Sequence, residues 1–184
     1  MALTATIHKA ELSISDMDRH YYATHALTLA RHPSETEERL MARLLAFALY
    51  ADERLEFGKG LSDTDEPALW RKAYTGEIEL WIDVGQPDET RLRKACNQSQ
   101  QVVVLAYGGH ATEVWWNKIA GSLARHDRLS VLVIDHADMQ QLVALCERAM
   151  RLQCLIQDGE LQLIAGEQTL MIRPDARMGE YAVA

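Results

Sequence analysis

Acidic side chains occur at three places in the sequence where they could act together. Asp83 ends an apolar stretch that is typical of a strand, Asp65 and Glu66 precede Pro67, and Glu38 lies near the start of an amphipathic segment. Carboxylate oxygens are the ligands that Mg²⁺ and Mn²⁺ prefer, and such a metal polarises a phosphate and activates water. The pattern therefore predicts a Mg²⁺ or Mn²⁺ site with Glu38, Asp65, Glu66 and Asp83 as its ligands.

Two cations follow Asp83 at a distance that suits a site of this kind. Arg91 and Lys94 lie one turn apart in a stretch that is typical of a helix. A cation beside a hydrolytic metal site positions the attacking water and balances charge. We therefore assign Arg91 and Lys94 to catalysis together with Asp83. The alternatives are an exposed helix face for the two cations, and a solvated strand end or a helix cap for Asp83.

Two neighbouring glutamates compete for the role of the first metal ligand. Ser34 is expected to be the N-cap of a helix over 34–51, with Glu37 completing a capping box three residues later. Glu37 lies near the middle of the apolar stripe of this helix, and Glu38 lies at its edge. Because the cap accounts for Glu37, we assign Glu38 to the site. A helix rotation of about 100° would exchange the two residues.

The elements that carry these residues follow an alternating pattern of strands and helices. Strand 77–84, helix 88–98 and strand 101–107 form a βαβ unit, so the two strands should be parallel. In an open sheet of this kind, ligand sites form beyond the carboxyl ends of the strands, where Asp83 lies. The remaining strands and helices of this part are expected over residues 67–74, 111–126, 129–134 and 136–150.

The two ends of the chain predict a second, smaller sheet. Residues 4–15 are typical of a strand, and a bulge or turn near Lys9 would reconcile the two phases of its apolar residues. Residues 19–32 fit either a short helix or an irregular strand, and residues 52–65 have the composition of a loop. The alternating stretch 152–172 predicts an antiparallel meander that pairs with the N-terminal strand.

Composition limits the classes of protein to consider. The chain has 184 residues with 19 basic and 27 acidic side chains, which predicts a single domain over 1–184 and argues against a broad non-specific nucleic-acid surface. Three cysteines without CxxC spacing predict reduced, buried thiols. No leader peptide and no apolar run of membrane length is visible, so we expect a cytoplasmic protein without a membrane partner.

Four segments of the sequence resemble the YaeQ family of bacterial proteins. They are HPSETEER at 32–39, ADER at 51–54, DEPALW at 65–70 and IELWIDVGQPDETRLRKAC at 78–96. This family is similar in fold to the PD-(D/E)XK nucleases, the restriction-endonuclease-like superfamily. The resemblance implies an α/β fold with a mixed central sheet flanked by helices, to which the N- and C-terminal strands add the antiparallel meander.

The nuclease pattern carries over to some positions of this sequence and not to others. Glu38 resembles the acid of the helix, and Asp83 resembles the first residue of the D/E-x-K tripeptide. Gly85 stands where the pattern has Lys, and Ala68 follows Pro67 where the pattern has Asp. The resemblance therefore implies that other residues replace them: Asp65 or Glu66 as ligand, Lys94 or Arg91 as cation, and Gln86 as polar partner.

Three functions remain open at this point. The first is a divalent-metal-dependent nuclease or phosphodiesterase with a variant site. The second is a catalytically degenerate member of the fold, a monomer or weak dimer, that binds nucleic acid or a protein partner in a regulatory role. An exposed indole from Trp115 or Trp116 would serve that role as a stacking platform or an anchor. The third is a small-molecule enzyme or regulatory scaffold unrelated to nucleic acid.

Overall fold

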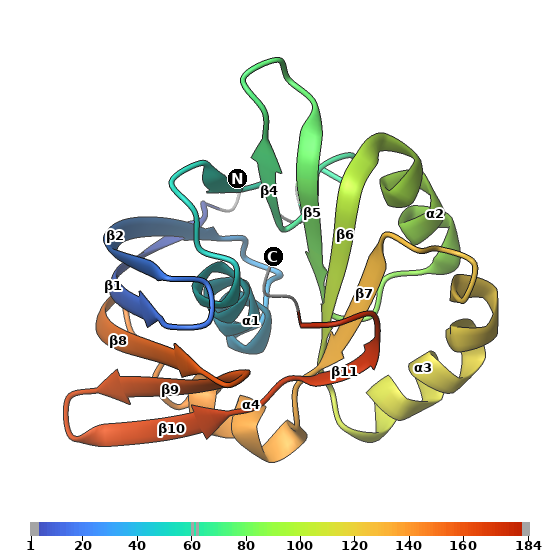
Figure 1. Ribbon diagram of the computed structural model, residues 1–184. Helices are drawn as coiled ribbons and strands as arrows, with labels where there is room; N and C mark the ends of the chain where they lie inside the picture. Colours follow the sequence, from blue (N-terminus) through green and yellow to red (C-terminus); the bar gives the residue numbers. More distant parts are fainter. Residues whose placement is uncertain (1–3, 60, 62, 182–184) are drawn as a thin grey trace.

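Two β-sheets with a helix between them organise the chain (Figure 1). The computed structural model describes residues 4–59, 61 and 63–181. In this part of the chain the strands are β1 (Thr6–Asp16), β2 (Tyr21–Arg31), β3 (Leu55–Phe57), β4 (Leu69–Lys72), β5 (Ile78–Val84), β6 (Ser99–Ala106), β7 (Leu129–Val133), β8 (Ala149–Gln157), β9 (Glu160–Ala165), β10 (Gln168–Ile172) and β11 (Asp175–Met178). The helices are α1 (Glu37–Leu49), α2 (Glu89–Gln98), α3 (His110–Leu123) and α4 (His136–Val143).

The larger sheet contains the βαβ units that the sequence predicts. Its strand order is β11-β7-β6-β5-β4-β3, and β5, β6 and β7 are parallel neighbours. The remaining strands of this sheet are antiparallel to their neighbours, which makes the sheet mixed. The carboxyl ends of β5, β6 and β7 therefore meet at one edge, and this edge carries the candidate site.

The smaller sheet joins the N-terminal strands to the meander from the C-terminal part of the chain, as predicted. Its order is β10-β9-β8-β1-β2, in which β8, β9 and β10 form the antiparallel meander and β8 pairs with β1 in parallel. The parallel pair makes this sheet mixed as well. The chain is thus an α/β fold with two mixed sheets.

Helix α1 lies in the centre and separates the sheets. Apolar residues of α1 pack with β1 and β8 of the small sheet and with β5 and β6 of the large sheet in one core cluster. On the opposite face of the large sheet, α2 and α3 cover a second cluster that includes Trp81 and Leu92. The apolar stripe of α1 is therefore wide because it faces apolar residues on both sides.

Strand β1 has no bulge, so that prediction was wrong. Its residues pair one to one with β2 from Thr6 opposite Arg31 to Asp16 opposite Tyr21. Every second residue of β1 from His8 to Asp16 is buried. This set includes the polar residues His8 and Asp16, which have polar partners. His8 Nδ1 lies 2.8 Å from the Glu147 carbonyl oxygen, and Asp16 accepts from Arg19.

The helix ends also differ from the prediction. Thr36, not Ser34, is the N-cap of α1, because its Oγ1 accepts from the Arg39 N–H at 3.1 Å. Glu37 is the first helical residue, so the predicted capping box is absent. Residues 19–32 contain a strand, and α4 ends at Val143 where a turn follows.

Two short strands were not predicted from the sequence. Strand β3 lies inside the predicted loop, and β11 follows the meander and returns to the large sheet beside β7. Within the described residues, no helix is both long enough and apolar enough to cross a membrane.

Candidate functional site

The candidate site is centred on Asp83, near the carboxyl end of β5. The side chain of Asp83 is buried, although its strand neighbours Ile82 and Val84 direct their side chains to the opposite face. Arg91 of α2 contacts it with two bonds, from Nε to Oδ2 at 2.8 Å and from Nη2 to Oδ1 at 3.0 Å. Both carboxylate oxygens of Asp83 therefore accept a hydrogen bond from one guanidinium group.

Arg91 is itself held in place by the loop that precedes β4. Its Nη1 donates to the Thr64 carbonyl oxygen at 2.6 Å, and its Nη2 donates to the Glu66 carbonyl oxygen at 2.9 Å. The guanidinium also lies 5.6 Å from the centre of the Trp81 ring. The hydrogen bond to Asp83 raises the pKa of Arg91, which keeps the group charged. Arg91 thus acts as a clamp that joins α2, β5 and this loop.

The predicted ligands Asp65 and Glu66 lie near Arg91 but are engaged elsewhere. Lys94 Nζ donates to Asp65 Oδ1 at 2.8 Å, and this hydrogen bond lowers the pKa of Asp65. Both side chains of the pair are exposed. Glu66 Oε2 accepts from the Lys59 backbone N–H at 2.8 Å. The hydrogen bonds between this segment and Arg91 involve its main chain, at the Thr64 and Glu66 carbonyls.

Glu38 turns toward the protein interior and Glu37 toward solvent. Oε1 of Glu38 is buried and has no hydrogen-bond partner. Glu37 lies at the surface, 3.7 Å from Arg31 Nη1. Glu38 raises the pKa of Tyr107, the residue that follows β6, although burial is the larger cause of its rise to about 12. Arg39, the next residue of α1, lines the same cavity as Asp83, so the start of α1 lies at the same edge of the large sheet.

A cavity of about 230 Å³ lies beside the Asp83–Arg91 pair. Its lining includes both residues, together with Arg39 of α1 and Gln86. Gln86 donates from Nε2 to the Tyr107 carbonyl oxygen at 3.1 Å and lies 3.2 Å from Thr112 Oγ1. The structure thus brings together three of the predicted catalytic residues and leaves Lys94 with Asp65 at the surface.

The four predicted ligands do not form a metal centre as they are arranged. In the described ranges 4–59, 61 and 63–181, no three His, Cys, Asp or Glu side chains are grouped so that they could hold a metal ion. Asp83, the central ligand of the prediction, has both oxygens bonded to Arg91. While Arg91 occupies both oxygens of Asp83, the residues at this edge do not fit the metal that the nuclease resemblance implies.

A buried ion cluster in α1 and the segment before it was missed by the sequence reasoning. Glu35 is only 2% exposed and accepts from Arg43 Nη2 at 2.6 Å and from Arg39. Burial lowers the pKa of Arg43, and Glu35 opposes this effect. The sequence feature that could have indicated this cluster is Arg43, a cation within the apolar stripe of α1. The cluster positions Arg39 in the wall of the cavity.

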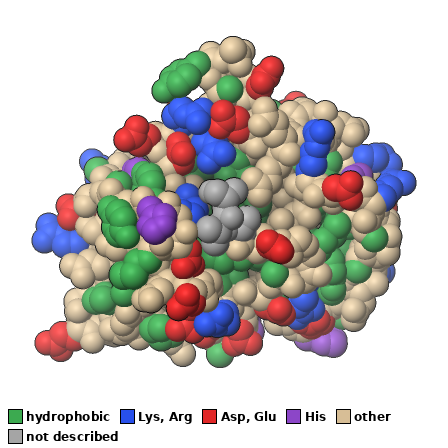
Figure 2. Space-filling view, viewed as in Figure 1, with side chains coloured by type: hydrophobic (Ala, Val, Ile, Leu, Met, Phe, Trp, Pro, Cys, Tyr) green, Lys and Arg blue, Asp and Glu red, His purple; other side chains and the backbone are tan. Residues whose placement is uncertain are grey.

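A basic surface, formed by α2, α3 and the segment after α3, lies on the outer side of the large sheet. Between residues 88 and 128 the sequence has six basic and four acidic side chains, whereas the whole chain has 19 and 27. We define this basic surface by its exposed cations Arg93, Lys94, Lys118, Arg125 and Arg128. In Figure 2 blue groups are visible on this side of the molecule, as they are elsewhere on the face shown.

Two features of the basic surface could contribute to binding. A cavity of about 340 Å³ is lined by Cys96, Asn97 and residues 125–128. Trp115 and Trp116 of α3 are both half-buried against the second core cluster, and Trp115 Nε1 donates to the Pro87 carbonyl oxygen at 2.9 Å. Neither indole is fully exposed, so the cations are the main feature of this surface.

Comparison with known proteins gives consistent matches over nearly the whole chain. The family model described as "YaeQ protein" matches residues 1–174. Proteins named "Uncharacterized protein YaeQ" are 46% identical over 173 residues in Salmonella typhi and 43% identical over 172 residues in Escherichia coli K12. These alignments cover 94% of this chain in both cases, and 96% and 95% of the relatives.

Solved structures agree with the fold described above. The crystal structure of the YaeQ protein from Xanthomonas axonopodis pv. citri has a TM-score of 0.93 at 58% identity, over 96% of this chain and 100% of that one. The YaeQ protein from Pseudomonas syringae has a TM-score of 0.93 at 34% identity, over 97% of this chain and 98% of that one.

Proposed function

The chain belongs to the YaeQ family, and we propose that it binds nucleic acid without hydrolysing it. This proposal takes the PD-(D/E)XK nuclease fold as the origin of the architecture, with the order α1, β4, β5, α2 and β6. It treats the site at the end of β5 as one that has changed from metal binding to an internal ion pair.

The bidentate contact between Asp83 and Arg91 carries the proposal. A hydrolytic site of this type needs a carboxylate with free oxygens for a divalent cation. Here both oxygens accept hydrogen bonds from Arg91, whose remaining contacts fix it to the Thr64 and Glu66 carbonyls. A metal would have to displace a cation that α2 and the 64–66 segment hold in place. The same pair suits a rigid scaffold that presents neighbouring surfaces.

The basic surface favours nucleic acid as the ligand over a protein partner. Residues 88–128 have more basic than acidic side chains on a chain whose net charge is −8, although Lys94 pairs with Asp65 and Arg125 lies 3.7 Å from Glu89. Phosphate groups bind to such clusters of Lys and Arg, and the release of counterions makes the affinity fall with salt. Arg125 and Arg128 flank the 340 Å³ cavity on this surface, which makes them the first residues to test.

Fluorescence anisotropy with labelled single-stranded and double-stranded DNA and RNA tests the proposal. We expect binding that weakens as salt rises, with oligonucleotides that remain intact in Mg²⁺ and Mn²⁺. The double variant Arg125→Glu/Arg128→Glu should reduce affinity by roughly tenfold or more and reduce the salt slope by about two, because two phosphate contacts are lost.

A charge reversal on the opposite sheet provides the matched control. Arg151 of β8 is exposed, and its Nε lies 3.7 Å from Glu11 Oε1. Strand β8 belongs to the small sheet, whereas α2 packs on the large sheet. Arg151→Glu should leave affinity unchanged. Equal loss of affinity in both variants, or the absence of binding to all four oligonucleotide types, would contradict the proposal.

Glu38 favours a metal-dependent phosphodiesterase as the second candidate function. Its buried Oε1 has no partner, and a bound cation at the same edge would provide one. Calorimetric titration of Mn²⁺ separates the candidates. Binding that is lost in both Glu38→Gln and Asp83→Asn, accompanied by cleavage of the oligonucleotides, would support this second function and overturn the first.

A further inference from the structure

The outer edge of β2 is open over most of its length, with Arg43 engaging it at Ala30. Strand β2 ends the order of the small sheet, and within the described residues no other strand pairs with its outer side. Native proteins usually protect such an edge with Pro, Lys, inward charges, a bulge or a very short strand. Strand β2 is 11 residues long, pairs with β1 without a break, and contains no Pro, Lys, Asp or Glu.

Alternate residues of β2 direct their backbone N–H and C=O groups outward. On β1, the Lys9 N–H donates to the Arg148 carbonyl on the β8 side, so His8 and Ala10 must bond to β2. Their partners on β2 are Leu29 and Leu27. The outward groups therefore belong to the intervening residues, all of which are exposed: Tyr22, Thr24, Ala26, Thr28 and Ala30.

We propose that β2 pairs with β2 of a second copy of this chain in an antiparallel, two-fold symmetric dimer. The two-fold axis passes beside Ala26, so that Ala26 lies opposite its own counterpart and Thr24 lies opposite Thr28. The two five-stranded sheets then form one continuous sheet. The pairing of outward backbone groups on both strands removes the open edge.

Charge supports a second copy as the occupant. Arg31 and the titratable His25 are the charge-bearing residues of β2, and in this register Arg31 lies opposite Tyr21 of the other copy. No like charges therefore face each other across the two-fold axis. The threonine pairs are a favourable cross-strand combination.

Shape on the outer face of the sheet also supports this register. Tyr22 is 61% exposed and Ile7 of β1 is 42% exposed. Ala30 pairs with Ile7 within one copy, and the proposed register places Tyr22 of the other copy next to that Ala30. Each large exposed ring thus fits over a small side chain and contacts an exposed aliphatic one. Figure 2 has hydrophobic side chains on the side of the molecule where β1 and β2 lie.

One end of the edge is already partly engaged, which limits the extent of the pairing. Arg43 Nη2 donates to the Ala30 carbonyl at 3.2 Å. A carbonyl oxygen has a second lone pair, so Ala30 can still accept from the other copy. The central residues from Thr24 to Thr28 carry the main ladder.

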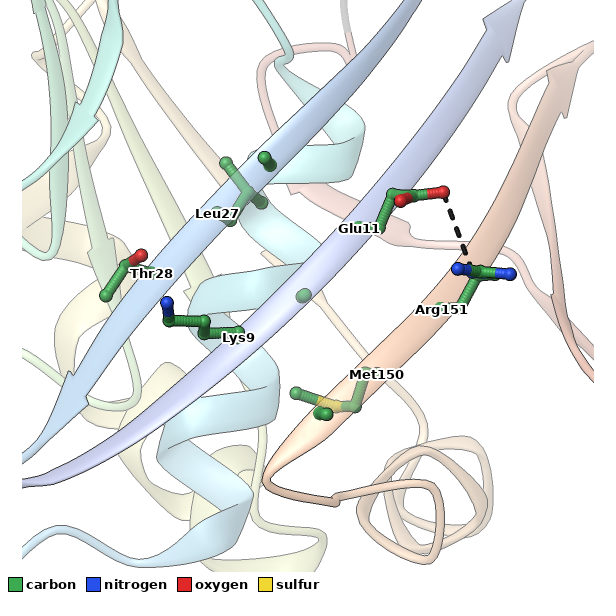
Figure 3. A pocket seen from close by; sticks show the side chains of 9 residues that line it. Lys9, Glu11, Leu27, Thr28, Met150 and Arg151 are labelled. Atoms are coloured by element: carbon green, nitrogen blue, oxygen red, sulfur yellow. Dashed lines mark ion pairs between the residues drawn. The ribbon is translucent and has the colours of Figure 1, made fainter.

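The hollow beside β2 remains open in the dimer. A cavity of about 360 Å³ lies on the outer face where Ala26 and Thr28 are short, and Lys9, Glu11 and Arg151 border it (Figure 3). Backbone pairing takes place at the strand edge and does not require this hollow to be filled. The dimer contact is therefore separate from the proposed nucleic-acid surface, which lies on the large sheet.

Sedimentation velocity over a concentration series tests the dimer. We expect the wild type to shift from monomer to dimer, and Ala26→Lys to raise the dimer dissociation constant at least about tenfold, because the two lysines would face each other. Thr169→Lys on β10, the strand at the other edge of the same sheet, is the matched control and should dimerise like the wild type. A wild type that stays monomeric, or an equal effect of both variants, would overturn the proposal.

Cysteine substitution tests the register without depending on stability. Residues directly opposite in a hydrogen-bonded antiparallel pair have Cα atoms about 5.5 Å apart, which a disulfide can span. Ala26→Cys should form a covalent dimer on mild oxidation, whereas Thr28→Cys alone should not, because Thr28 faces Thr24. Covalent dimers that form equally in both variants would exclude this register.

Discussion

At the scale of single residues, Arg91 decides what Asp83 can do. The carboxylate is buried, and its other neighbours on β5 are apolar or aromatic. Removal of Arg91 leaves the buried charge of Asp83 without a partner. This lowers the free energy of unfolding more than replacement of both residues of the pair. We expect Arg91→Ala to lower the free energy of unfolding by about 2 kcal/mol, measured by urea denaturation, because Arg91 is partly exposed and part of the cost is screened.

The ion pair of Lys94 and Asp65 is the control for that measurement. Both side chains are exposed, so Lys94→Ala should leave the unfolding midpoint unchanged within error. Asp83→Asn/Arg91→Ala should be more stable than Arg91→Ala alone, because the buried charge is gone. A loss in Arg91→Ala no larger than that in Lys94→Ala would mean that the clamp does not stabilise the fold.

The sequence pattern predicts where Asp83 lies but does not determine its partner. A strand followed by a helix fixes where the residue lies, because the carboxyl end of a parallel strand is defined by the chain direction. Whether a nearby guanidinium binds a carboxylate or a substrate depends on side-chain conformation, which residue spacing does not determine. Lys94, one turn further along α2, turns instead to Asp65.

At the scale of elements, the start of α1 depends on a single hydroxyl group. Thr36 Oγ1 accepts from the Arg39 N–H, while Ser34 is exposed and contacts His32. Removal of an N-cap hydroxyl typically costs about 1 kcal/mol. We expect Thr36→Ala to lower the free energy of unfolding by about that amount and Ser34→Ala to have little effect, both measured by denaturant titration. The opposite ranking would restore Ser34 as the cap.

The predicted secondary structure was wrong or ambiguous where polar residues occupy buried positions and where a strand lies at the edge of a sheet. The buried phase of β1 contains His8 and Asp16, so the apolar residues alone indicated two phases where there is one. Alternation in β2 is weak because the inward side chains of this edge strand, such as Ala23 and His25, are half-exposed. Strand β3 has three residues and β11 four, which is too short for a period to be visible.

At the scale of the whole molecule, the last strand ties the two sheets together. The chain leaves β10 in the small sheet and enters β11 at the edge of the large sheet beside β7. Arg177 of β11 also binds Glu113 of α3 with two hydrogen bonds. Strand β7 is buried along its whole length, so β11 covers an apolar edge. The family match ends at residue 174, just before this strand.

Truncation after Pro174 tests how far the fold depends on this tie. The shortened chain exposes the backbone edge of β7, and an open apolar edge promotes association between chains. We expect the melting temperature to fall by roughly 5–10 °C, which corresponds to about 2–3 kcal/mol for a chain of this size, with light scattering that increases on heating. Truncation after Gly179 retains β11 and removes, among the described residues, Glu180 and Tyr181 with its contacts to Tyr50 and Leu49, so comparison of the two truncations isolates the contribution of the strand. Equal melting temperatures for the two truncations would show that β11 contributes little and that Tyr181 provides the connection at this end of the chain.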